Sequence, residues 1–362
     1  MGIKNLNQFL KKYKIHETLD ISVLKYTKIA IDTPMFLFKF KGVCDLYSND
    51  WLGCFITLIT FLRKWDIHPI FIFEGQAPPE KFNTQLERRE QRQKMIAKTD
   101  LIESDLNDYI SNGSCTPLLL EICEKVKKQK NKSLLSKKTL IKNNLDVSSV
   151  KEEIDRRRNY EITITQEDLK TLKDLLNLMG ISFIQSSGEA EADCVSLLYN
   201  GQVDYIVSED TDVLAYCNYK EVDFNVITSF NVHTNTFTFI SKHKVLNTLN
   251  LSSESFRDFC IMCGTDYNKN IPRVGTETAY KFIIKYHQIE NMPLDVGILN
   301  HKEIRKIFEV KYNNDLNKFI KWCYVPINFL DSFAFFIFEN NIKNVNVNNV
   351  FKALSEAEIE IK

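Results

Sequence analysis

Four short apolar segments, each ending at a carboxylate or closely followed by one, constrain the fold of this chain more than any other feature. They cover residues 28–33, 68–75, 181–185 and 203–208, and their length and composition are those of buried strands. Helical patterns at 165–179, where Thr165 and Asp168 form a capping pair, and at 187–200 alternate with the later segments. This alternation predicts an α/β fold with a mainly parallel central sheet flanked by helices.

The acids beside these segments predict a shared metal site. The carboxyl ends of parallel strands meet at one edge of a sheet, so the acids should gather there. So many like charges would repel and raise one another's pKa, a cost that divalent cations remove. Two Mg²⁺ ions about 4 Å apart can activate water for phosphodiester hydrolysis. We therefore expect two Mg²⁺ ions, with Mn²⁺ able to substitute, held among Asp32, Glu74, Glu189, Glu191, Asp210, Asp212 and Asp266.

Two of these acids have a simpler explanation. Glu189 and Glu191 open a predicted helix, where free N–H groups favour negative charge without any metal. Asp210 and Asp212 argue for the metal, because a one-residue separation in extended chain aims both side chains the same way. Together with the strand-end acids, they make a metal site the better explanation of the whole set.

The charge of the chain is balanced overall but not evenly distributed. Lys and Arg number 47, as do Asp and Glu, so the net charge is zero. Residues 81–142 hold fourteen Lys or Arg against eight Asp or Glu, a local net charge of +6, with Lys-rich stretches at 125–132 and 137–142. This segment is either a solvated helical insertion or a basic surface for nucleic acid.

Several functional classes find no support in the sequence. The N-terminus has no apolar stretch of signal-peptide length, and Leu6 occupies the position where a myristoylation signal has Ser or Thr. The apolar run 51–62 is too short to cross a membrane and predicts a packed helix. Cys260 and Cys263 form one isolated CxxC, which does not predict zinc. We expect a soluble, intracellular, monomeric protein with no membrane partner.

At the acidic positions the sequence resembles the XPG and flap endonuclease family of structure-specific 5′ nucleases. The blocks that carry the resemblance follow the family's order and extend to about residue 285: MGIKNL, IAIDTPMFLFKF, FIFEGQAPPEK, GISFIQSSGEAEAD, YIVSEDTDVLAY and CGTDYNKNIPRVG. The resemblance implies a PIN-like nuclease core. It also implies hydrolysis of DNA at flaps or other single-strand/duplex junctions in replication, repair or recombination. The location would be the nucleus, or the host nucleus if a virus encodes the chain.

The resemblance also implies roles for individual residues. Asp32, Glu74, Glu189 and Glu191 would serve the first metal ion, and Asp210, Asp212 and Asp266 the second. Lys81 and Arg88 match the basic pair at the reacting phosphate, and their seven-residue spacing puts both on one helix face. Arg92 continues that stripe towards the DNA. Phe38 matches the aromatic residue on which a base near the scissile bond stacks, although an ordinary core role explains it equally well.

The resemblance divides the chain into five regions. They are an N-terminal nuclease region (1–105), a helical arch insertion that a single-stranded 5′ flap threads (76–150), an internal nuclease region (160–225), a helix–two-turn–helix region (255–295) and a C-terminal cap (296–362). Segment 264–280 would grip duplex DNA, with Gly264 and Gly275 beside the phosphate backbone. A potassium ion at that hairpin is part of the family pattern.

Several residues depart from the family pattern. Glu74 stands where the family usually has Asp, which should shift the first metal site slightly. Arg273 replaces a hairpin glycine, and Glu277 and Thr278 occupy positions that are often basic. Duplex binding and the potassium ion are therefore less well supported than cleavage. No sliding-clamp box is evident around Phe335 and Phe336, because Ser332 stands where an aliphatic residue is needed.

Two other functions are compatible with the same residues. A 5′-to-3′ exoribonuclease could share the same acidic core, although the arch-like insertion and segment 264–280 favour DNA. A non-catalytic DNA-binding scaffold is the other alternative, and the intact set of seven acids argues against it. The preferred junction and the cellular pathway do not follow from the sequence.

Overall fold

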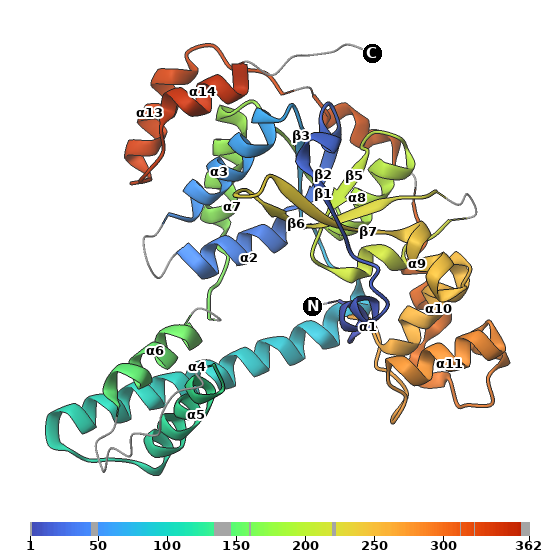
Figure 1. Ribbon diagram of the computed structural model, residues 1–362, viewed down its shortest axis with the longest axis horizontal. Helices are drawn as coiled ribbons and strands as arrows, with labels where there is room; N and C mark the ends of the chain where they lie inside the picture. Colours follow the sequence, from blue (N-terminus) through green and yellow to red (C-terminus); the bar gives the residue numbers. More distant parts are fainter. Residues whose placement is uncertain are drawn as a thin grey trace.

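The fold is built on a seven-stranded mixed sheet (Figure 1). The computed structural model describes residues 2–44, 50–133, 146–158, 161–218, 222–311, 313–321 and 323–355. The strand order is β1-β7-β6-β5-β2-β3-β4; β6, β5, β2, β3 and β4 run parallel, and β7 pairs antiparallel with both β6 and β1. The strands are β1 Glu17–Asp20, β2 Lys28–Asp32, β3 His68–Phe73, β4 Ser182–Gln185, β5 Tyr205–Val207, β6 Asn225–Asn231 and β7 Thr236–Ser241.

Both faces of the sheet are covered, as expected for parallel strands that are apolar on both sides. On β2, Ile29 and Ile31 point into one hydrophobic core and Ala30 points into the other. One core lies under α1 Leu6–Lys12, α8 Ala190–Tyr199, α9 Lys242–Leu249, α10 Ser253–Cys263, α11 Thr276–Tyr286 and α12 His301–Ile307. The other lies under α2 Thr33–Cys44, α3 Trp51–Lys64, α7 Gln166–Leu178, α13 Phe329–Glu339 and α14 Val347–Ser355.

The expected α/β fold is confirmed, and the four predicted strand segments are β2, β3, β4 and β5. The predicted capping pair is also present, since the Thr165 hydroxyl accepts from the Asp168 N–H and the Asp168 carboxylate accepts from the Thr165 N–H. The remaining strands escaped prediction. β1 is a four-residue, mostly exposed edge strand, and the β6–β7 hairpin carries Thr, Ser and Asn among its apolar residues. Their apolar pattern is too short or too interrupted to stand out.

The apolar run at 51–62 folds as predicted into a packed helix, α3. It spans Trp51–Lys64 and starts at Asp50, whose carboxylate accepts the Gly53 N–H at 3.2 Å. Within the described ranges, no helix combines the length and apolar character needed to cross a membrane.

The basic segment forms three helices that extend away from the sheet (Figure 1). Helix α4 (Phe82–Asn112) begins beside the sheet, and its far half packs against α5 (Pro117–Ser133) and α6 (Val147–Arg158). These helices share a small core of their own, formed by Ile102, Leu106, Leu119, Ile122, Cys123, Val126, Val150 and Ile154. The stretch 137–142 and the side chains of 127–133, which include most of the predicted Lys-rich surface, lie outside the described residues.

Two loops at the carboxyl edge of the sheet are joined by backbone hydrogen bonds. Gly75 N–H donates to Gly188 O at 2.7 Å, and Gln76 N–H donates to Ser187 O at 3.2 Å. The contact is so close that a Cβ at residue 75 would lie 2.2 Å from Ser186 O, whereas a Cβ at residue 188 would meet its nearest atom at 4.0 Å. The absence of a side chain at Gly75 therefore lets the loop after β3 reach the loop before α8.

We predict that Gly75→Ala and Gly188→Ala will behave differently. The added methyl at 75 must push apart two backbone segments, which should lower the free energy of unfolding by about 2 kcal/mol. The same methyl at 188 has room and should change that free energy by no more than about 0.5 kcal/mol. Urea unfolding of both variants is the measurement, and equal losses would mean that the two loops are not tightly joined.

Candidate active site

The predicted acids gather at the carboxyl edge of the sheet, where β3, β2 and β5 lie side by side. Asp32 is the last residue of β2, and Glu74 directly follows β3. Asp210 and Asp212 follow β5, with Asp210 accepting the Asp212 N–H at 3.2 Å. Glu189 is the N-cap of α8 and Glu191 lies in the first turn of that helix. Three neighbouring strand ends and one helix start therefore supply six of the seven acids, and Asp266 comes from the segment after α10.

The tightest part of the cluster contains three acids. Glu191, Asp210 and Asp212 each offer a carboxylate oxygen, and these oxygens all lie within 4.8 Å of one another. Around them, short hydrogen bonds hold the other acids. Ser208 Oγ donates to Asp32 Oδ2 at 2.9 Å, and the Ala190 N–H donates to Glu74 Oε2 at 3.0 Å. An N–H in the first turn of α8 thus orients the carboxylate of Glu74, which follows β3.

The protonation behaviour of the acids reflects their crowding. Burial, together with the nearby carboxylates of Glu74 and Asp210, raises the pKa of Asp32 to about 7, although the Ser208 hydrogen bond acts in the opposite direction. Burial and the charge of Asp210 raise the pKa of Asp212 well above its usual range. Burial and the charge of Asp212 do the same to the pKa of Glu191. The protein alone thus leaves part of this negative charge uncompensated.

The donor set fits a hard divalent cation. Glu189 Oε1 and Asp212 Oδ1 are buried, and no hydrogen-bond donor in the described part of the chain reaches either atom. Buried acceptors are normally paired, and a metal ion satisfies them as well as a donor does. Carboxylate oxygens are the ligands that Mg²⁺ and Mn²⁺ prefer. The cluster is therefore suited to bind metal.

Two basic side chains reach the acids from the start of α4. Lys81 Nζ lies 2.5 Å from Glu189 Oε2 and 4.0 Å from Asp266 Oδ2. Burial lowers the pKa of Lys81, but the Glu189 charge and hydrogen bond outweigh it, and the net pKa lies above its usual value. Arg88 Nη2 lies 2.5 Å from Asp266 Oδ1. The structure therefore brings Lys81, Arg88 and Asp266 to the predicted site.

Two buried tyrosines, which the sequence did not single out, form hydrogen bonds with the acids. The Tyr216 hydroxyl donates to Glu191 Oε1 at 3.3 Å. The Tyr267 hydroxyl lies 3.2 Å from Glu189 Oε2 and 3.4 Å from Glu191 Oε1. Both phenols remain protonated donors, because burial and the neighbouring carboxylates raise their pKa values. In the sequence they resemble ordinary core aromatics, and only the proximity of Tyr267 to Asp266 could have drawn attention to one of them.

Gly2 also packs against the acids. A Cβ on Gly2 would lie 1.8 Å from Asp210 Oδ1 and 3.1 Å from Asp212 Oδ1, and its φ of +88° favours glycine. The N-terminal segment therefore forms one wall of the cluster, and a side chain at residue 2 would displace its acids.

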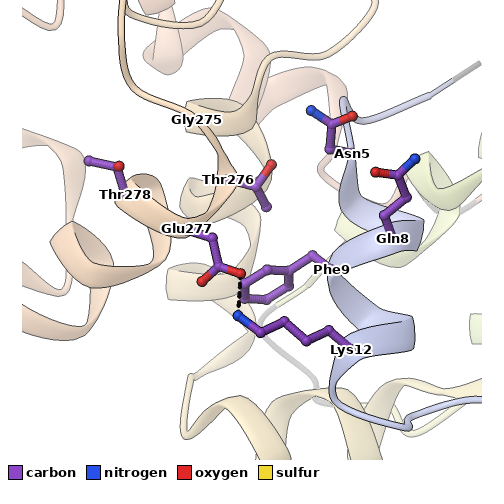
Figure 2. A pocket seen from close by; sticks show the side chains of 8 residues that line it. All are labelled: Asn5, Gln8, Phe9, Lys12, Gly275, Thr276, Glu277 and Thr278. Atoms are coloured by element: carbon purple, nitrogen blue, oxygen red, sulfur yellow. Dashed lines mark hydrogen bonds and ion pairs between the residues drawn. The ribbon is translucent and has the colours of Figure 1, made fainter.

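A separate cavity of about 330 Å³ lies between α1 and α11 (Figure 2). Gly275 is the N-cap of α11, and a Cβ there would meet nothing within 4 Å. Lys12 from α1 reaches across and pairs with Glu277 at 2.6 Å. Arg273, which stands where a hairpin glycine is expected, keeps a left-handed backbone with φ of 65°. Arg273 therefore adopts the left-handed conformation that glycine favours, and Lys12 offsets the acid at position 277.

The other predicted contact residues differ in how accessible they are to a ligand. Phe38 on α2 is 42% exposed, so it is available for a ligand and is not a core residue. Arg92 donates to the Ile162 carbonyl at 2.7 Å and ties α4 to the segment before α7. Gly264 is buried, and its N–H donates to the Ile261 carbonyl at 3.1 Å, which leaves it unavailable to a phosphate.

Known proteins resemble this chain in sequence and in fold. Residues 1–95 match the XPG N-terminal domain and residues 180–266 match the XPG I-region. The chain is 53% identical to a probable RAD2-like endonuclease of Invertebrate iridescent virus 3, covering 100% of this chain and 99% of that protein. It is 26% identical to flap endonuclease 1 of Cryptosporidium parvum, covering 99% and 71%. The catalytic core of Rad2 in complex with DNA substrate has a similar fold, with a TM-score of 0.63 at 16% identity, covering 99% and 100%.

We predict that Asp212→Asn will stabilise the metal-free protein at alkaline pH. When the pKa of a carboxyl is higher in the folded than in the unfolded protein, the free energy of unfolding falls as the pH rises from the unfolded pKa to the folded one. The Asn side chain does not titrate, so the variant avoids this loss. In chelator, the variant should melt roughly 3 °C above wild type at pH 8, with a smaller difference at pH 5. Other titrations, such as that of His68, are common to both proteins and cancel in the comparison.

Added Mg²⁺ should raise the melting temperature of wild type more than that of Asp212→Asn. A difference between the two proteins that stays constant with pH, and that Mg²⁺ does not change, would contradict a crowded acidic metal site.

Proposed function

Since this chain belongs to the family of XPG, Rad2 and flap endonucleases, we propose that it cuts DNA where a duplex meets a single strand with a free 5′ end. It is a RAD2-like, structure-specific DNA endonuclease. The type of DNA junction that it cuts is what we propose here. Support for that part comes from the surfaces on either side of the acids.

The observation that most supports this proposal is that α4 starts at the acid cluster. This helix begins at the acid cluster, where Lys81 pairs with Glu189 and Arg88 pairs with Asp266, and then extends away from the sheet. A single strand that follows the basic segment is therefore led to the carboxylates. Lys81 and Arg88 would then stabilise charge on the phosphate at which the strand is cut.

Two Mg²⁺ ions are part of the same proposal. Asp32, Glu74 and Glu189 would serve one ion and Asp210, Asp212 and Asp266 the other. Glu191 is assigned to the first ion by resemblance, yet it offers a carboxylate oxygen within 4.8 Å of those of Asp210 and Asp212, so it would also suit the second ion. When bound, the ions would activate a water and stabilise the leaving oxygen.

The duplex arm would bind on the side of α1 and α11. The open cavity at Gly275 gives a phosphate access to the first turn of α11, and Lys12 supplies a positive charge beside it. The Lys12–Glu277 pair is exposed, so its contribution to stability is small and a phosphate can compete for the lysine. We expect the duplex contact to be weaker than that of a relative with basic residues at these positions.

The test is single-turnover cleavage of labelled 5′-flap, bubble, gapped, single-stranded and fully duplex DNA. We expect cutting at the junction of the flap in Mg²⁺ or Mn²⁺ and none in chelator. Binding without cutting is expected in Ca²⁺, whose looser coordination positions water poorly. A bulky protein attached to the 5′ end before the enzyme is added should suppress cutting if the flap must be threaded.

Two outcomes of that test would count against the proposal. Equal rates on flap, single-stranded and duplex DNA would remove the junction preference. Undiminished cutting in excess chelator would remove the two metal ions. Asp210→Asn serves as the control, because it should bind flap DNA in Ca²⁺ while losing most of its turnover in Mg²⁺.

We predict that Lys81→Ala and Arg88→Ala will lower the single-turnover rate by about 10²-fold or more, in line with the loss of a group that stabilises transition-state charge. Flap affinity in Ca²⁺ should change little, because the proposed role lies in the chemical step. Arg89→Ala is the matched control, since Arg89 is exposed on the same helix and carries the same charge. If all three variants lose affinity equally and keep a normal rate, α4 acts only as an electrostatic track.

A further inference from the structure

A second cavity, of about 610 Å³, lies next to the acid cluster on the side of Glu74 and Glu189. Its walls are the loop 76–79, Phe82 and Gln85 of α4, and Ser187. Gln76 lies two residues after Glu74 and Ser187 two residues before Glu189, and Gln76 N–H donates to Ser187 O at 3.2 Å. The wall formed by these two loops is therefore joined by the backbone to two of the acids.

Phe82 gives this cavity an aromatic wall. It is the first residue of α4, its side chain is 63% exposed, and it directly follows Lys81, whose amino group lies 2.5 Å from Glu189. Pro78 and Pro79 add further flat apolar surface. An occupant with a flat ring could bury this surface, which is otherwise left to water.

The polar groups of the cavity identify the kind of ring. Gln76, Gln85 and Ser187 offer amide and hydroxyl groups that can both donate and accept hydrogen bonds. None of the residues that line the cavity is charged, so the lining suits an uncharged group rather than a phosphate. A nucleobase combines a face for stacking with an edge for such hydrogen bonds.

A second exposed aromatic residue, Phe38, helps to relate the base in this cavity to the acids. Phe38 lies on α2 next to Lys39, which pairs with Glu209 at 2.5 Å, so α2 contacts the segment that carries Asp210. Phe82 lies on the Glu189 side, at the root of the basic insertion. Exposed aromatic residues therefore occur on two elements that contact the acidic region, α2 through the Lys39–Glu209 pair and the start of α4 through the Lys81–Glu189 pair.

We propose that the cavity at Phe82 is a stacking site for a base of the single-stranded arm, one that has passed the scissile phosphate on its way to α4. The inference rests on the proposed function and adds a binding site to it. The ring holds the arm in line with the cluster after the phosphate has been positioned. Loss of the ring should therefore weaken capture of the arm and leave the metal site intact.

The test compares Phe82→Ala, Phe82→Trp and Leu86→Ala on flaps with one abasic nucleotide moved along the single-stranded arm. Leu86 is 43% exposed on the same helix and does not line the cavity. Phe82→Ala should bind a normal flap in Ca²⁺ about tenfold more weakly, within the range for loss of one base–aromatic stack. One abasic position should cause the same loss in wild type and no further loss in Phe82→Ala. Phe82→Trp should retain wild-type affinity.

A fluorescent base gives an independent readout. 2-Aminopurine at the sensitive position should be quenched by wild type in Ca²⁺ and remain bright with Phe82→Ala, on flap DNA and on the isolated single strand alike. If Phe82→Ala matches Leu86→Ala on every substrate, or if abasic losses add to the mutation at every position, the stacking site is overturned. A wild type that quenches the base but shows no preference for flaps would refute the proposed junction and leave the stacking site in place.

Discussion

The mutual repulsion of carboxylates at one edge of the sheet is the constraint on which the rest of the site depends. Parallel strands β3, β2 and β5 bring these acids together, and the rigid backbone prevents them from moving apart. Part of this negative charge is compensated by hydrogen-bond donors from the surrounding structure: the Ser208 hydroxyl, the Ala190 N–H, the two tyrosine hydroxyls and Lys81. The compensation is incomplete, as the raised pKa values of Asp32, Glu191 and Asp212 indicate. The site therefore gains stability when a cation arrives.

The sequence predicted the sheet and the acids for one physical reason, namely that strand ends in a parallel sheet converge. Asp32 and Glu74 could be placed together without knowing any side-chain contact, because each stands at the carboxyl end of an apolar strand. Tyr216 could not be placed, because its hydroxyl meets Glu191 only after α8 and the segment following β5 have packed. The exposure of Phe82 could not be predicted either, because nothing in the sequence distinguishes an aromatic residue at a helix start that faces a cavity from one that is buried.

Long-range pairs explain why the departures from the family pattern were harder to interpret. From the sequence, Glu277 looks like an acid placed where DNA should bind. In the structure it is held by Lys12, a residue 265 positions earlier in the chain, so the local charge is close to neutral. Arg273 likewise adopts a left-handed backbone that glycine would favour, at a modest conformational cost. Neither feature follows from local sequence.

The hydrogen bond from Arg92 to the Ile162 carbonyl has a consequence for how the family can vary. It joins two points 70 residues apart where the helical insertion starts and ends, and the described helices between them share a small core of their own. The entropy of closing a loop between two such points grows only logarithmically with its length. Residues can therefore be added to or removed from the far end at little cost in stability, and the reach of the insertion can evolve separately from the chemistry at its base.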